Sequence, residues 1–199
     1  MVETFAESPL AARTDQLASA ARPDRLRLRE LAFTTQINLR VDPTSDTAER
    51  IATAIRVMLP QQPGEVVTAG DLAVLWLGPD EWLIVGPQLE SARTRKTLND
   101  AVATDFGAVT DVSAHRTIIE VSGPCTRDLL AKGCSLDLHP RALAPSRCAR
   151  TRLARAQVVL VCWDATAPRY WLMVRSSFAC YLADWLTDAA SEFRQEGWT

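Results

Sequence analysis

The chain has 199 residues, 47% of them hydrophobic, and its 22 Lys and Arg residues nearly balance 24 Asp and Glu residues, for a formal net charge of -2. This length suits one large domain or two small lobes with a sizeable core. The charge balance gives no general attraction to nucleic acid or to an anionic membrane, and no apolar run approaches the roughly 20 residues that span a bilayer.

Residues 1–24 are rich in alanine and contain two prolines. This composition predicts a mobile arm, or an arm that orders only against a partner. The segment lacks the apolar core of a secretory signal. A compact domain is therefore expected to begin at residue 25.

The first half of the chain predicts a mixture of strands and helices. Leu26–Val41 predicts one long strand, because apolar and polar residues alternate near its start and again at Ile37, Leu39 and Val41. Asp46 and Glu49 are spaced as in a capping box, and the helix that follows should stop at Pro60.

A hairpin is predicted next, because two apolar runs, Leu72–Leu77 and Glu81–Val85, flank a Gly-Pro-Asp turn. Gln61–Gly70 before it is predicted to be a loop. A helix from about Leu89 to Phe106 and a strand at Ala108–Val112 should follow.

The stretch from Asp111 to Asp137 predicts a strand, a tight Gly-Pro corner and a short helix that ends at Gly133. After an irregular loop, Gln157–Trp163 is almost entirely apolar, as in a strand buried on both faces. Apolar residues at helical spacing from Phe178 to Phe193 predict a final amphipathic helix.

These elements predict an α+β fold with two similar β-rich lobes, each with amphipathic helices. The lobes should cover about residues 25–106 and 107–199 of one compact domain.

Candidates for catalysis are few. Asp111, Ser113 and His115 alternate along one segment, whereas hydrolytic triads are assembled from separate elements. Cys125 follows the Gly-Pro corner at a helix start, where a thiolate would be stabilised, but a packed thiol is the simpler interpretation. The sequence predicts no catalytic, cofactor-binding or metal site on this chain.

The cysteines are odd in number and widely spread, and no C-x-x-C pair is present. With two histidines in the chain, this spacing argues against a metal site. Free thiols and a cytoplasmic location are predicted.

The segment 141–155 is rich in arginine and contains no acidic residue. It is either a solvated face or a cradle for an anionic cofactor or an acidic partner. Because arginine is enriched at interfaces, we predict that this segment, with the N-terminal arm, docks onto a larger partner. The predicted interface residues are Arg141, Arg147, Arg150, Arg152 and Arg155.

Thr110–Asp137, TDVSAHRTIIEVSGPCTRDLLAKGCSLD, resembles the gamma subunits of heterotetrameric sarcosine oxidase. Leu77–Gly86, Cys148–Leu160 and Val174–Phe193 resemble the same family, so the likeness covers roughly residues 25–195. The segment Asp111–Trp185 is also similar, more loosely, to the folate-binding T-protein of the glycine cleavage system.

The resemblance implies the T-protein fold and an accessory role in a complex that demethylates sarcosine to glycine, hydrogen peroxide and methylenetetrahydrofolate. It implies alpha, beta and delta subunits as partners, with FAD, FMN, NAD and zinc on those subunits and no cofactor on this chain. The alternative is a free-standing folate-dependent aminomethyltransferase-like or repair protein. Where the T-protein carries an acid at its folate site, the corresponding run Ala149–Cys162 has no carboxylate.

Overall fold

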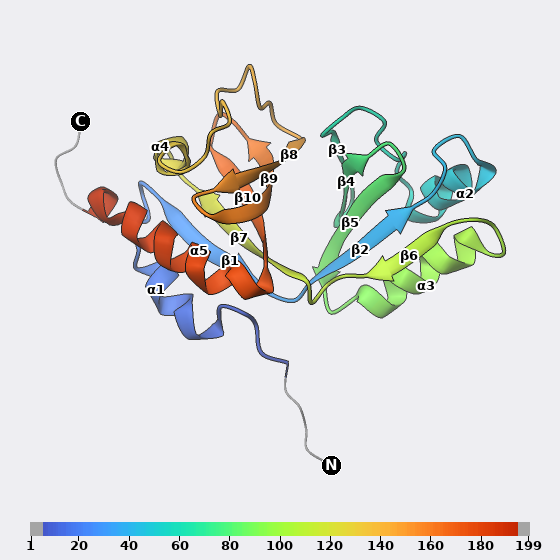
Figure 1. Ribbon diagram of the computed structural model, residues 1–199, viewed down its shortest axis with the longest axis horizontal. Coiled ribbons are helices and arrows are strands. Elements are labelled where there is room, and N and C mark those ends of the chain that lie inside the picture. The colour runs from blue at the N-terminus through green and yellow to red at the C-terminus, as the bar shows by residue number, and fades with distance from the viewer. Residues whose placement is uncertain (1–5, 195–199) are drawn as a thin grey trace, which may run out of the picture. The chain divides into compact units, whose positions relative to one another are not determined.

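The computed structural model describes residues 6–194, so residues 1–5 of the predicted arm lie outside the described part. The chain divides into two compact units, each with one five-stranded sheet and helices on one face of it (Figure 1). The α+β class with two similar β-rich lobes is confirmed. No helix within residues 6–194 is both long and apolar enough to cross a bilayer.

Unit 1 takes its described residues from Met1–Ala32, Arg116–Pro145 and Arg150–Thr199. Its sheet has the order β1-β7-β10-β9-β8. Its elements are η1 (Ala11–Arg13), α1 (Thr14–Ala18), β1 (Arg27–Leu31), β7 (Arg116–Ser122), α4 (Thr126–Ala131), β8 (Arg147–Leu153, which begins in unit 2), β9 (Ala156–Asp164), β10 (Arg169–Arg175), α5 (Ser176–Ala189) and η2 (Ser191–Arg194).

Unit 2 consists of Phe33–His115 and Ser146–Ala149. Its sheet has the order β3-β4-β5-β2-β6, and β4 and β5 form the predicted hairpin. Its elements are β2 (Thr34–Arg40), α2 (Asp46–Ile55), β3 (Val66–Ala69), β4 (Leu72–Gly78), β5 (Glu81–Gln88), α3 (Ser91–Val102) and β6 (Ala108–Asp111).

The strand predicted at Leu26–Val41 is two strands in two different sheets. The chain turns at Ala32 and Phe33, and Phe33 takes a φ of 55°. This turn puts β1 in unit 1 and β2 in unit 2, so the predicted boundary between lobes at residues 106 and 107 is not where the structure divides the chain.

The segment predicted as a mobile arm is folded from about Leu10 onward. Leu10, Leu17 and Ala20 have exposed fractions of 0–1% and belong to the same core as α5. Arg13 clamps Asp184 of α5 with two hydrogen bonds of 2.8 and 3.0 Å. These bonds hold the pKa of Asp184 below its usual range.

The short helix α4 ends for a different reason from the one predicted. Gly133 follows the C-cap Lys132 and does not have the positive φ of a left-handed cap. A Cβ atom on Gly133 would lie 2.6 Å from the indole ring of Trp185. Glycine is required here because α5 packs closely against this turn.

Replacing Gly133 with alanine should lower the free energy of unfolding by about 1–2 kcal/mol, because the added methyl group overpacks the contact with Trp185. The matched control is Gly78→Ala, where the new Cβ would meet Glu81 at an ordinary 3.5 Å. Chemical denaturation of both variants checks this. Equal stabilities would contradict the packing explanation.

Candidate functional site

The structure separates the five arginines that the sequence groups together. Arg141 is exposed and lies 3.7 Å from Asp137. Arg147 donates a hydrogen bond of 2.8 Å to the carbonyl oxygen of Pro63.

Arg155 is exposed in the turn after β8, and its backbone N–H donates to the hydroxyl of Tyr181 at 3.3 Å. Only Arg150 and Arg152, both on β8, line a common pocket.

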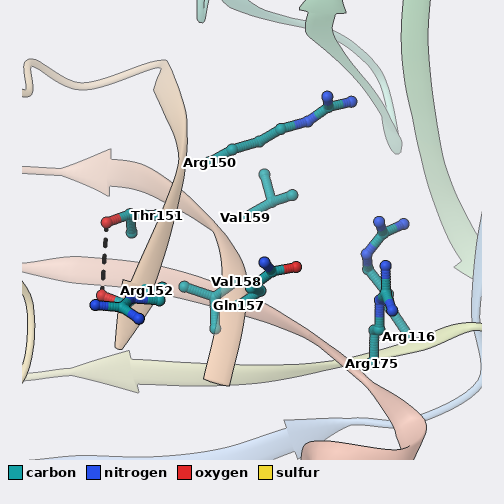
Figure 2. A pocket seen from close by; sticks show the side chains of 8 residues that line it. All are labelled: Arg116, Arg150, Thr151, Arg152, Gln157, Val158, Val159 and Arg175. Atoms are coloured by element: carbon teal, nitrogen blue, oxygen red, sulfur yellow. Dashed lines mark hydrogen bonds between the residues drawn. The ribbon is translucent and has the colours of Figure 1, made fainter. Parts of the chain in front are cut away.

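This pocket, called here the basic pocket, has a volume of about 370 Å³ and lies wholly within unit 1 (Figure 2). Four arginines line it, and none of its lining residues is acidic. It is lined by Arg116, Arg150, Thr151, Arg152, Gln157, Val158, Val159 and Arg175.

Two strand ends bring Arg116 and Arg175 into the basic pocket. Arg116 begins β7 and Arg175 ends β10, and the two are direct partners in the antiparallel register. Figure 2 shows their side chains together, with Arg150 extending from β8 beyond Val159. Like charges directly opposite one another are unfavourable in a sheet, so this arrangement concentrates positive potential.

The position of Arg116 and Arg175 was not predicted, because neither lies in the arginine-rich segment. The available signal is that an arginine occupies the first position of β7 and another the last position of β10. That signal becomes informative only once β7 and β10 are known to be antiparallel neighbours.

A buried acid lies further along β7 from the basic pocket. Glu120 is 5% exposed, and its carboxylate accepts hydrogen bonds from Arg29 at 2.8 Å and from the indole of Trp171 at 3.1 Å. Trp163 packs edge-on against Trp171 with ring centroids 4.6 Å apart. A buried charge requires such partners, so these contacts account for the burial of Glu120.

The three residues considered for a triad form a turn. The hydroxyl of Ser113 donates to Asp111 at 2.6 Å, and the backbone N–H of Ser113 donates to the same oxygen at 3.0 Å. Burial opposes ionisation of Asp111, but these bonds hold its pKa below its usual range. The N–H of His115 closes the turn on the carbonyl of Val112 at 2.9 Å.

The five cysteines have free thiols, and their burial differs. We expect a titration of the denatured chain to count five thiols. In the native chain, the half-buried Cys134 and Cys180 should react before Cys125, Cys148 and Cys162, which are buried. Burial also raises the pKa of Cys162, which lowers its thiolate fraction. Fewer than five thiols without reductant, or early reaction of Cys162, would contradict this expectation.

Within residues 6–194, no three His, Cys, Asp or Glu side chains are grouped so that they could hold a metal ion. The basic pocket is therefore the candidate site with the most distinctive chemistry. Guanidinium groups bind carboxylates and phosphates through paired N–H donors.

The family model and the curated relatives that match this chain point to the same family. Residues 40–192 match the sarcosine oxidase, gamma subunit family. The sarcosine oxidase subunit gamma of Corynebacterium sp. (strain P-1) is 38% identical over 192 residues, which cover 95% of this chain and 92% of that protein.

Two solved structures are similar. A chain of the heterotetrameric sarcosine oxidase from Corynebacterium sp. U-96, in complex with pyrrole 2-carboxylate, has a TM-score of 0.89 and 36% identity, covering 98% of this chain and 100% of that one. The glycine cleavage system aminomethyltransferase T from Bartonella henselae has a TM-score of 0.70 and 13% identity, and the match covers 92% of this chain and 57% of that one. The second likeness supports the predicted T-protein fold.

Proposed function

Because this chain belongs to the sarcosine oxidase, gamma subunit family, we propose that it is the accessory subunit of a heterotetrameric enzyme that oxidises sarcosine. The observation that carries this proposal is the end-to-end likeness to a chain of such an enzyme, with no large unmatched part on either side. The reaction would release glycine, hydrogen peroxide and methylenetetrahydrofolate.

In this proposal the other subunits, alpha, beta and delta, carry FAD, FMN, NAD and zinc, and the complex is cytoplasmic. This chain contributes binding surface to the assembly. We expect the isolated chain to elute from gel filtration without a flavin absorption spectrum and to leave sarcosine unoxidised.

For docking, we propose the surface around the basic pocket, with Arg150 and Arg152 at its centre. Arg141, Arg147 and Arg155 lie outside the pocket lining. We propose that these three charges mainly tune the rate of association, as charges outside the buried centre of an interface do.

The test is to tag the chain, purify it from its native host and identify its partners by mass spectrometry. Recovery of the large flavoprotein subunits is expected. A triple variant, Arg150→Ala, Arg152→Ala and Arg155→Ala, should recover much less of them, with an unchanged circular dichroism spectrum. Unchanged recovery at low and moderate salt would place the docking surface elsewhere.

The alternative is a free-standing folate-dependent aminomethyltransferase-like or repair protein. The likeness to aminomethyltransferase T is one of fold at 13% identity. A chain that is recovered alone, and that binds tetrahydrofolate in calorimetry, would favour this alternative.

A further inference from the structure

We propose that the basic pocket receives carboxylate side chains from an acidic segment of one of the larger subunits. The inference rests on the proposed function and names the partner chemistry at that surface. It is carried by the position of Arg116, Arg150 and Arg175 around one pocket of unit 1.

The geometry favours a carboxylate ligand. Arg116 and Arg175 are opposite one another on β7 and β10, so two planar guanidinium groups are presented together. Each guanidinium can hold both oxygens of a carboxylate, which adds direction to the attraction between charges.

The polar lining beside the arginines suits a protein segment. Val158 and Val159 also line the pocket, but they are only 4% and 3% exposed and so offer a ligand little apolar contact area. Gln157 is exposed and provides an amide that can donate to a second acidic side chain or to a backbone carbonyl.

The position of the pocket at the edge of the sheet is compatible with binding of an extended segment. Arg150 and Arg152 stand on β8, the last strand of its sheet, whose outer edge is already bonded on either side of them, by Cys148 to Gly64 and by Ala154 to Gly133. The short stretch between these bonds is the part of β8 along which an extended partner segment can lie. The partner's acidic residues would then fall at intervals beside the arginines.

The experiment titrates the complex of the larger subunits with this chain and measures the dissociation constant. Arg175→Gln and Arg150→Gln should each raise that constant about 30-fold, the effect of losing one partner of a buried charge pair. Arg150→Lys should give a smaller increase because lysine keeps the charge but not the planar fork. The matched control is Arg93→Gln on α3, an exposed arginine 3.6 Å from Glu90, which should change the constant less than about threefold.

A second measurement separates binding from folding. Because Arg175 faces Arg116, Arg175→Gln should leave the melting temperature of the isolated chain unchanged or raise it, while it weakens assembly. A fall in melting temperature that parallels the loss of assembly would mean a structural role and would overturn the inference.

The remaining outcomes are also decisive. If the wild-type chain assembles and all pocket variants assemble equally well, the pocket does not bind the partner. If inorganic phosphate binds the isolated chain in calorimetry, is lost in Arg150→Gln, and assembly is unaffected, the pocket is a small-anion site. If the wild-type chain fails to join the larger subunits, the proposed function fails, and this inference fails with it.

Discussion

Replacing Leu17 with alanine should lower the free energy of unfolding by about 2–5 kcal/mol, as is usual for a leucine removed from a packed core. Leu17 is 1% exposed and shares a core with α5 and the sheet of unit 1. The helix that carries it is further held by Arg13, whose guanidinium grips Asp184 on both oxygens. Thermal and chemical denaturation of the purified variant measure the loss.

The control for this prediction is Leu136→Ala, which removes a leucine that is 36% exposed in the same unit. Its cost should stay below about 1 kcal/mol, because little apolar surface returns to water. If both variants unfold at the same denaturant concentration, the N-terminal segment is a mobile arm and its position against α5 is wrong.

Replacing Gly123 with alanine should cost about 2–4 kcal/mol, because two independent penalties combine. Gly123 has a φ of +114°, which L-residues rarely adopt, and a Cβ atom there would lie 2.6 Å from the backbone carbonyl oxygen of Arg25. That carbonyl also accepts a hydrogen bond of 3.1 Å from the N–H of Cys125. The Gly-Pro corner therefore fixes the start of α4 against the chain that leads into β1.

The variant Gly70→Ala measures the backbone penalty without the steric one. Gly70 has a φ of +55°, and its added Cβ would meet nothing within 4 Å. This variant should cost only about 1 kcal/mol, from the backbone conformation alone. If Gly123→Ala is no more harmful than Gly70→Ala in chemical denaturation, the close approach to Arg25 contributes nothing to stability.

Local patterns in the sequence predict the fold well where they have clear boundaries. The hairpin of β4 and β5 is marked by a Gly-Pro-Asp turn between apolar runs, and α5 by apolar residues at helical spacing. The turn between β1 and β2 has no such mark. Neither Ala32 nor Phe33 is a typical turn-forming residue, so the change of sheet is invisible until the pairing of the strands is known. The edge strand β3 was missed because its four residues lie among turn-forming residues.

The candidate site could likewise be predicted from the sequence only in part. Arg150 and Arg152 are recognisable because they share one strand with no acid nearby in sequence. Arg116 and Arg175 join them through the antiparallel pairing of β7 and β10, which links positions far apart in the chain. The N-terminal arm was misjudged for a related reason, since Leu10 and Leu17 are buried only by contacts with distant elements.

Membership of this chain in the enzyme complex is tested most directly by native mass spectrometry of the sarcosine-oxidising fraction, purified from a host in which this chain carries the tag. We expect one copy of the 21.9 kDa chain in a complex with three different subunits, and activity that elutes with the complex. A tagged chain that elutes alone, while the sarcosine oxidase activity elutes without it, would contradict the account.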